Sequence, residues 1–297
     1  MKETQPSPGL SVVVPAYNEE EAIGEVIDQI RLALEGFPLP YEIIAVDDGS
    51  LDRTAEVLRE KPVRLLQHGR NKGYGAALKT GILAAKHRHV AIVDGDGTYE
   101  PGDLLKLARS MEDFDMVVGA RTGKQVRIPW IRRPAKWILT QLANFLAETR
   151  IPDLNSGLRI FDREIAERFF NILPSNFSFT STITMAMLTN GYSVEFVPTS
   201  YRKRKGKSKI RPLQDTVNFF SLIVRTALYF APLKIFIPLS FSIIALSLVK
   251  MILIDILLIQ NLTESTLLLL LAGIQIGMLG LLADLIDKRS PSLGKKK

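Results

Sequence analysis

The stretch SVVVPAYNE, residues 11–19, shows the pattern that decides the fold: a short run of β-branched residues followed directly by polar ones. The pattern returns in EIIAVDDGS at residues 42–50 and in VAIVDGDG at residues 90–97. Helical patterns lie between these runs, and strands that alternate with helices indicate βαβ units and a mainly parallel sheet. The sequence therefore predicts an α/β domain over residues 1–212.

The polar residues after these three strands are expected to meet. Ligands of parallel sheets bind at the carboxyl ends of the strands, which lie along one edge. Taken alone, each polar group has a structural explanation, because Asp and Asn cap helices and Asp-Gly forms turns. Three such groups at successive strand ends favour a site. The expected elements are strands at Ser11–Pro15, Glu42–Val46, Val63–Leu66, Val90–Val93 and Met116–Val118, and helices at Glu20–Leu34, Thr54–Glu60, Gly75–Ala85 and Asp103–Met111.

Asp94 and Asp96 form the most specific of these groups. They are two residues apart at a strand end, so both carboxylates are expected on one side. Gly95 between them lets the backbone approach a ligand closely. Two hard oxygen donors without His or Cys suit Mg²⁺ or Mn²⁺, and such a metal neutralises charge on a departing diphosphate.

The charge of the chain is concentrated in one segment. Lys and Arg number 38 against 31 Asp and Glu, a net charge of +7, and the run RKRKGKSKIR at residues 202–211 holds seven bases and no acid. The remaining 31 bases balance the 31 acids, which argues against a generally basic nucleic-acid-binding protein. The absence of Cys excludes disulfides, zinc–thiolate sites and a cysteine nucleophile, and three His argue against a His-rich metal site.

The C-terminal third is strongly apolar. Two membrane helices are predicted at about 231–253 and 265–286, within a transmembrane hairpin at 231–286. Lys234 and Lys250 lie near the ends of the first, where lysine can reach the headgroups. A buried core hairpin of a soluble protein is the alternative, although residues 267–271 leave no polar face.

The flanking charges predict the orientation. Bases precede the first span and follow the second, in the basic tail 287–297, and the loop between the spans has none. Both termini and the catalytic domain are therefore expected on the cytoplasmic side of a plasma or cell membrane. An amphipathic helix at 213–230 is expected to lie in the membrane interface. Trp130–Thr149 is also amphipathic, and its tryptophans are either interfacial anchors or packed inside the domain.

The set PAYNE, DDGS and D-x-D over residues 10–212 resembles the family-two glycosyltransferases. The resemblance implies the GT-A fold, a Rossmann-like arrangement around a mainly parallel sheet. Three further features narrow the family resemblance: the segment Asp153–Arg159, the segment Arg204–Lys209 and the terminal hairpin. With them the chain resembles the dolichyl- or polyprenyl-phosphate sugar synthases, of the dolichol-phosphate mannose synthase type.

The resemblance implies a role for particular residues. The nucleotide pocket would include Pro15, Tyr17 and Glu19, with Val46 and Asp48 at the base and ribose, Asp47 nearby and Asp94 adjoining. The metal would be held by Asp94 and Asp96, with Asp96 the principal ligand. The sugar and acceptor phosphates would meet Arg121, and the acceptor phosphate at the membrane surface would meet Arg204, Ser208 and Lys209. The catalytic set implied is Asp94, Asp96, Arg121, Arg204 and Lys209.

The chain departs from the family pattern at Thr98. Mannose synthases of this type often read D-x-D-x-Q, with the glutamine contributing to the metal. A threonine hydroxyl is a shorter and weaker ligand, or acts through water. The metal's identity and the donor sugar are therefore left open.

These features predict a membrane glycosyltransferase that moves a sugar from a UDP- or GDP-sugar to a polyprenyl or dolichyl phosphate on the cytoplasmic face. A phosphate monoester is mostly dianionic at pH 7, so the acceptor needs no general base. The resemblance implies single-step, metal-assisted inversion at the anomeric carbon. A homo-oligomer is left open.

Three alternatives fit the sequence less well than this prediction does. A processive polysaccharide synthase would carry a Q-x-x-R-W segment and more membrane helices, neither of which the sequence has. A membrane-anchored nucleotide-sugar-binding or scaffolding protein without turnover would not need the Asp94/Asp96 pair. Nucleic acid is not expected on the basic run, because no aromatic residue interrupts it and anionic membrane lipid is the nearer partner.

Overall fold

The computed structural model describes residues 7–100, 102–121, 133–175, 178–200, 228–229 and 232–289. The chain divides into two compact units, residues 1–215 with 294–297, and residues 216–293. The first contains the α/β domain and the second an apolar helical hairpin. The predicted basic run at 202–211, the helix at 213–230 (except Leu228 and Tyr229) and residues 290–297 lie outside the described residues.

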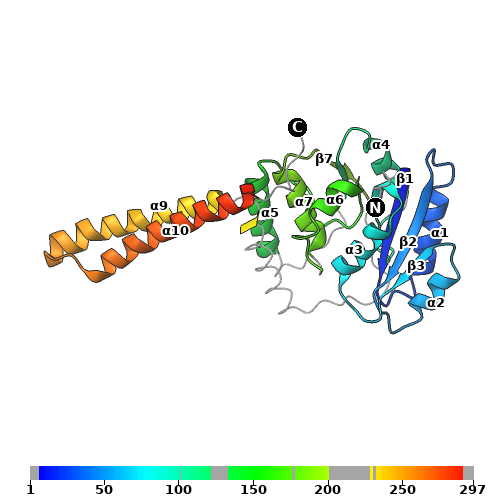
Figure 1. Ribbon diagram of the computed structural model, residues 1–297, viewed down its shortest axis with the longest axis horizontal. Helices are drawn as coiled ribbons and strands as arrows, with labels where there is room; N and C mark the ends of the chain where they lie inside the picture. The colour runs from blue at the N-terminus through cyan, green and yellow to red at the C-terminus, as the bar shows by residue number, and fades with distance from the viewer. Residues whose placement is uncertain are drawn as a thin grey trace. The chain divides into compact units, whose positions relative to one another are not determined.

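The described part of the first unit is built around a seven-stranded sheet with the order β3-β2-β1-β4-β6-β5-β7 (Figure 1). β6 runs antiparallel to both of its neighbours, and every other pair is parallel. The predicted mainly parallel α/β fold is confirmed. The strands are β1 Ser7–Ala16, β2 Tyr41–Asp47, β3 Arg64–Gln67, β4 His87–Ile92, β5 Met116–Ala120, β6 Arg159–Asp162 and β7 Val194–Pro198.

The register places the polar groups along one edge of the sheet. Ala16 at the end of β1 pairs with Asp47 at the end of β2, and Val13 of β1 pairs with Ile92, the last residue of β4. The expected gathering of strand-end groups is therefore confirmed. Because β6 is antiparallel, it starts at this same edge, and the segment before it lies there too.

Helices cover both faces of the sheet, as Figure 1 shows for α1 and α3 on either side of β1 and β2. One face packs its apolar residues, including Val12 and Val14 of β1, against Ile27 of α1 and Leu104 of α4. The other face meets α3 so closely that a Cβ on Gly81 would lie 2.4 Å from Val13 Cγ1. The helices are α1 Ile23–Ala33, α2 Thr54–Arg59, α3 Tyr74–Ala84, α4 Gly102–Ser110, α5 Arg133–Ala147, α6 Arg163–Arg168 and α7 Phe179–Thr189.

α5 contains Trp137, one of the two tryptophans for which interfacial anchoring and packing inside the domain are the alternatives. The helix is amphipathic, with Ala143 and Leu146 buried. Trp137 is 64% exposed and Phe145 is 55% exposed, so neither ring packs in the domain core. Trp130 lies outside the described residues.

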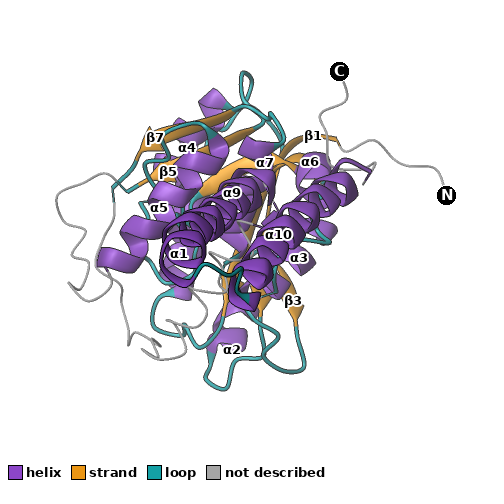
Figure 2. Ribbon diagram, turned by 90° about the vertical axis from the view of Figure 1, so that its left-hand side faces the viewer, coloured by secondary structure: helices purple, strands orange, loops and turns teal. Residues whose placement is uncertain are grey.

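The second unit is a hairpin of two long apolar helices, which lie side by side in Figures 1 and 2. α9 Pro232–Lys250 continues as the π-helix η2 Met251–Ile259, and α10 spans Glu264–Arg289. The stretches 232–259 and 264–286, of 28 and 23 residues, are long and apolar enough to span a membrane. Close packing depends on glycine, because a Cβ on Gly280 would lie 2.5 Å from Phe236 Cβ.

The first apolar helix is longer than the sequence indicated. It ends at Ile259 instead of Leu253, so Asp255 lies within helix and not in the connecting loop. Its carboxylate accepts hydrogen bonds from Lys250 Nζ at 3.1 Å and from the Thr263 amide at 3.0 Å. Lys250 also donates to Thr263 and Thr266. This lysine therefore binds groups inside the hairpin instead of reaching outward as expected.

Candidate active site

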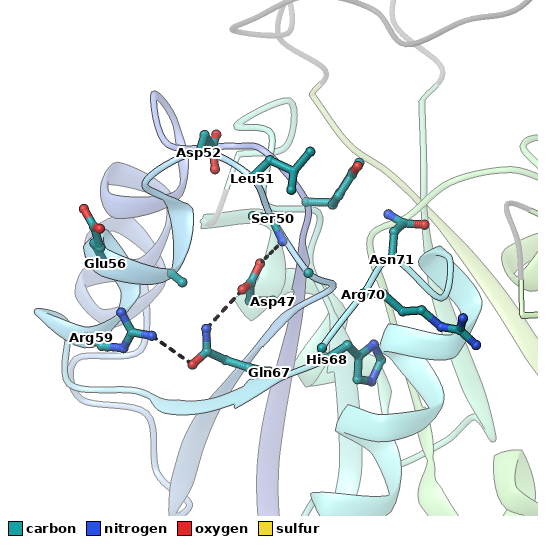
Figure 3. Close-up of a pocket in the computed structure, with 14 residues that line it drawn as sticks. Asp47, Ser50, Leu51, Asp52, Glu56, Arg59, Gln67, His68, Arg70 and Asn71 are labelled. Atoms are coloured by element: carbon teal, nitrogen blue, oxygen red, sulfur yellow. Dashed lines mark hydrogen bonds between the residues drawn. The ribbon is translucent and has the colours of Figure 1, made fainter.

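A pocket of about 600 Å³ lies at the carboxyl ends of β1, β2 and β3 (Figure 3). Of the predicted nucleotide-site residues, Tyr17 and Asp47 line it. The others are not among its described lining residues: Pro15, Glu19, Val46, Asp48 and Asp94. The wall also includes Ser50, Asp52 and Arg70. The sequence gives no role to the other polar residues of the wall, which are Glu56, Arg59, Gln67, His68 and Asn71.

Asp47 is fixed at the base of this pocket. It is 3% exposed and accepts hydrogen bonds from the Ser50 amide at 3.1 Å and from Gln67 Nε2 at 3.2 Å. The side-chain oxygen of Gln67, Oε1, in turn accepts a hydrogen bond from Arg59 at 3.1 Å, and Figure 3 shows this chain of contacts. Gln67 comes from β3 and Arg59 from α2, so only the folded chain brings them to Asp47.

The loops after β1 and β2 form one unit. Asn18 has a positive φ of 51°, a conformation that Asn tolerates better than most residues. Its amide donates to Ser50 Oγ at 2.9 Å, and its side-chain oxygen accepts from the Leu51 amide at 2.7 Å. The Glu19 amide donates to Thr54 Oγ1 at 2.8 Å. The PAYNE segment therefore shapes the pocket through its backbone as well as through Tyr17.

Asp48 is bound to the loop that follows β3, and its predicted contact with the base or ribose stays a prediction. Its buried carboxylate lies 2.6 Å from His68 Nδ1 and accepts from the amides of Lys72 at 3.0 Å and Gly73 at 2.8 Å. His68 Nε2 lies 2.9 Å from Thr80 Oγ1 of α3. Asp48 thus holds the loop 68–73.

Pro15 and Val46 lie in the sheet. They pair with each other across β1 and β2. The side chain of Val46 is fully buried, and a Cβ on Gly81 would lie 3.2 Å from its Cγ2. Their predicted contacts with a nucleotide stay predictions.

The acidic pair follows β4. Asp94 Oδ1 accepts a hydrogen bond from the Tyr74 hydroxyl at 2.7 Å. Burial, and then the negative charge of Asp96, raise the pKa of the Asp94 carboxyl to about 6. Burial and Asp94 raise the pKa of Tyr74 well above its usual value, so this phenol stays protonated and donates.

Thr98 acts on Asp96. Its hydroxyl donates to Asp96 Oδ1 at 2.7 Å, its amide donates to the same oxygen at 3.1 Å, and the residue is 1% exposed. This threonine orients the second carboxylate, and its predicted direct contact with a metal stays a prediction.

The acidic pair fits a hard divalent cation. Asp94 and Asp96 supply carboxylate oxygens, and the repulsion that raises the pKa of Asp94 is what a cation would relieve. The described residues hold no group of three or more His, Cys, Asp or Glu that could bind a metal. Two protein ligands suit Mg²⁺ or Mn²⁺, which complete their coordination with water and phosphate oxygens.

The segment Asp153–Arg159 closes the other side of the acidic pair. Asp153 is 5% exposed and binds Arg121 through two contacts, at 2.6 and 2.9 Å. Tyr99 accepts a hydrogen bond from the Gly157 amide at 2.6 Å. A Cβ on Gly157 would lie 2.1 Å from Asp94 Oδ2, so only glycine fits beside this carboxylate.

The fold therefore brings part of the predicted catalytic set together. Asp94, Asp96 and Arg121 share the edge, and the charge of Arg121 counteracts the rise in the pKa of Asp94. Arg204, Ser208 and Lys209 lie outside the described residues. Sequence reasoning missed Tyr74, because an aromatic residue opening a helix gives no signal of its own. The sequence places Asp153 and Gly157 in a motif that narrows the family resemblance and gives neither residue a role.

The profile of the family described as "Glycosyl transferase family 2" matches residues 11–170. The chain belongs to glycosyl transferase family 2. A second profile, "GtrB C-terminal hairpin", matches residues 231–288. This protein is a glycosyltransferase, and its acidic strand ends lie within the matched region.

The glycosyltransferase has relatives named for lipid-phosphate acceptors. It is 32% identical over 221 residues to the dolichyl-phosphate hexose transferase of Haloferax volcanii, covering 74% of this chain and 94% of that one. It is 32% identical over 194 residues to the dolichyl-phosphate beta-glucosyltransferase of Drosophila melanogaster, covering 58% of this chain and 60% of the relative.

The fold is that of the GT-A enzymes. The structure of glucosyl-3-phosphoglycerate synthase from Mycobacterium tuberculosis, in complex with Mn²⁺, uridine diphosphate and phosphoglyceric acid, matches with a TM-score of 0.59. The match covers 74% of this chain and 78% of that one at 21% identity. The predicted GT-A fold, followed by two helices apolar enough to span a membrane, is confirmed.

Proposed function

We propose that this glycosyltransferase moves a sugar from a UDP- or GDP-sugar to a polyprenyl or dolichyl phosphate at the cytoplasmic face of a membrane. One observation carries the proposal: the pocket around Asp47 and the acidic pair Asp94/Asp96 occupy one sheet edge, in a chain that also has an apolar hairpin. The names of the two relatives support a lipid-phosphate acceptor.

The nucleotide of the donor occupies the pocket at the ends of β1, β2 and β3. Tyr17 and Asp47 contact the base and ribose there, and Arg70, another lining residue, binds phosphate. Guanidinium groups bind phosphate with paired hydrogen bonds, which suits Arg70 for this task. Pro15, Glu19, Val46 and Asp48 support the pocket from the sheet and the adjoining loops.

Asp94 and Asp96 hold the divalent cation, Mg²⁺ or Mn²⁺. When bound, the cation offsets the negative charge that builds up on the leaving nucleoside diphosphate. Thr98 keeps Asp96 oriented, since its hydroxyl and amide donate to one oxygen of that carboxylate. The structural neighbour that contains Mn²⁺ and uridine diphosphate supports a metal in this fold.

The acceptor phosphate is bound by Arg121 together with Arg204, Ser208 and Lys209. Arg121 is held by Asp153 through a bidentate pair, which fixes the direction of its guanidinium. The lipid phosphate is mostly dianionic at neutral pH and attacks without a general base. The task of the protein is to hold two anions together against repulsion, and attack from the face opposite the leaving group inverts the anomeric carbon.

The hairpin crosses the membrane with both chain termini on the cytoplasmic side. The bases outside the two spans, and their absence between the spans, support this orientation. The donor is then drawn from the cytoplasm, and the acceptor phosphate from the same leaflet surface. The basic run at 202–211 contributes general attraction to anionic lipid.

The test is transfer of labelled sugar to lipid. Purified full-length protein in detergent is incubated with a polyprenyl phosphate and, separately, UDP-glucose, UDP-N-acetylglucosamine and GDP-mannose, with and without a chelator. One donor is expected to give a chelator-sensitive lipid-linked sugar, and Asp96→Asn is expected to lower the rate by about 100-fold or more. No product from any donor would contradict the transferase proposal, and full activity of Asp96→Asn would contradict the metal assignment.

A further inference from the structure

Tyr74 connects two parts of the site that are far apart in the sequence. It opens α3, directly after the loop 68–73, and its hydroxyl donates to Asp94 Oδ1 at 2.7 Å. The loop contributes His68, Gly69, Arg70 and Asn71 to the wall of the pocket. One segment therefore borders the nucleotide pocket at one end and the acidic pair at the other.

Asp48 fixes this segment from the end of β2. Both of its oxygens are used: Oδ1 accepts from the Lys72 amide and contacts His68 Nδ1, and Oδ2 accepts from the Gly73 amide at 2.8 Å. The amides belong to the two residues immediately before Tyr74. The start of α3, and with it the phenol, is thus set by a carboxylate of the DDGS group.

Asp94 is enclosed on its other side by backbone. Gly157 lies so close that a Cβ there would be 2.1 Å from Oδ2. Gly157 is itself held by Tyr99, which accepts from its amide. The Asp94 carboxylate is therefore oriented by the Tyr74 hydroxyl at Oδ1 and by the close backbone of Gly157 at Oδ2.

We propose that Asp48 and Tyr74 are positioning residues, through which the loop bordering the nucleotide pocket sets the orientation of the cation-binding carboxylate Asp94. The inference rests on the proposed function for the identity of the cation and the donor. It differs from the role that the family resemblance implies for Asp48, a contact with the base or ribose. In this arrangement Asp48 acts through the loop, and the pocket and the acidic pair form as one unit.

The test measures metal binding directly. Mn²⁺ binding to the full-length protein in detergent is followed by electron paramagnetic resonance in the presence of UDP. Tyr74→Phe keeps the ring and removes the hydroxyl, and partners of metal ligands typically change affinity by about 10- to 100-fold. We expect the Mn²⁺ dissociation constant to rise by about tenfold or more, with metal-free UDP binding changed by less than about twofold.

Tyr192→Phe is the matched control. Tyr192 is 5% exposed and its hydroxyl accepts a hydrogen bond from Arg168, away from the acidic pair. We expect its Mn²⁺ affinity to equal that of the wild type. Unchanged Mn²⁺ affinity in Tyr74→Phe, or an equal loss in Tyr192→Phe, overturns the proposal, as does a wild-type protein that binds no Mn²⁺.

Asp48→Asn tests the other end of the connection, and by itself it is expected to raise the Mn²⁺ dissociation constant, which keeps the proposal testable if Tyr74→Phe fails to fold. Measured with Tyr74→Phe in a double-mutant cycle, its effect on Mn²⁺ affinity is expected to be strongly non-additive, because both act on Asp94 by one path. Additive effects, or loss of UDP binding alone in Asp48→Asn, overturn the role of Asp48. A wild type that binds Mn²⁺ and UDP and transfers no sugar contradicts the proposed function only.

Discussion

At the scale of single residues, the orientation of the two carboxylates of the acidic pair depends on hydrogen-bond donors and on a glycine that contact them. Thr98 donates twice to one oxygen of Asp96, and Tyr74 donates once to Asp94. Gly157 contributes by having no side chain, because any Cβ would overlap the Asp94 carboxylate. The orientation of the acidic pair is therefore decided by neighbours from three separate segments.

Gly157→Ala tests this closeness. The added methyl has to displace Asp94 or the backbone, and overpacking of this kind costs about 1–3 kcal/mol. We expect sugar transfer to fall by about tenfold or more, measured as initial rates of labelled product. The matched control is Gly102→Ala at the start of α4, where a Cβ would meet nothing within 4 Å. Equal rates in the two variants would show that Gly157 does not constrain Asp94.

At the scale of elements, the antiparallel strand β6 and the hairpin are the informative parts. β6 lies between β4 and β5 and runs antiparallel to both. It therefore begins at the sheet edge where β4 and β5 end, and the preceding residues Asp153 and Gly157 lie at that edge. In the hairpin, Ser240 Oγ donates to the Gly273 carbonyl across the helix pair at 2.7 Å, whereas Ser242 Oγ donates to Pro238 in its own helix. Polar groups between apolar helices are satisfied within the pair, which apolar surroundings require.

Ser240→Val and Ser242→Val form a matched pair for the hairpin. Ser240 is 6% exposed and faces Gly273 and Gly277, so valine there separates the helices and costs about 1–3 kcal/mol. Ser242 is exposed, and its substitution is expected to change stability by less than about 0.5 kcal/mol. Hydrogen exchange of α9 and α10 in lipid nanodiscs is expected to accelerate about fivefold or more in Ser240→Val alone. Equal exchange in both variants would contradict the packing role of Ser240.

At the scale of the whole molecule, the net positive charge of the chain equals the charge of one short segment. The seven bases of residues 202–211 account for the net +7. The segment lies in the sequence between the last described strand of the catalytic domain and the hairpin. It combines two proposed tasks, general attraction to anionic lipid and a specific grip on the acceptor phosphate.

Single substitutions separate these two tasks. Arg202→Ala and Lys203→Ala are expected to weaken only the attraction of this segment to anionic lipid, by about 1 kcal/mol per charge, and to leave turnover nearly unchanged. Arg204→Ala and Lys209→Ala are expected to lower turnover by about tenfold or more while the hairpin keeps the protein in the membrane. Transfer rates and vesicle flotation are measured for all four. Equal losses of turnover at all four positions would mean that the run acts only as bulk charge.

The sequence by itself determined the local features of this protein. Periodicity located the strands β1 to β5 and the helices α1 to α5, because β-branched runs and amphipathic spacing act over a few neighbours. It also identified Asp94 and Asp96, since polar residues directly after strands of a parallel sheet have one edge to share, whereas Arg121 followed only from the family resemblance. It did not locate β6, α6, α7 or β7, whose short or uniformly apolar runs carry no distinctive period.

Only the tertiary structure decided which groups meet. Asp48 binds amides 24 and 25 positions along the chain, Tyr74 reaches Asp94 across 20, and Asp153 reaches Arg121 across 32. Such partners depend on strand order and on the reversed direction of β6, which no local pattern encodes. The physical reason is that hydrogen bonds and ion pairs require contact within about 3 Å, and contact between distant residues is a property of the folded chain.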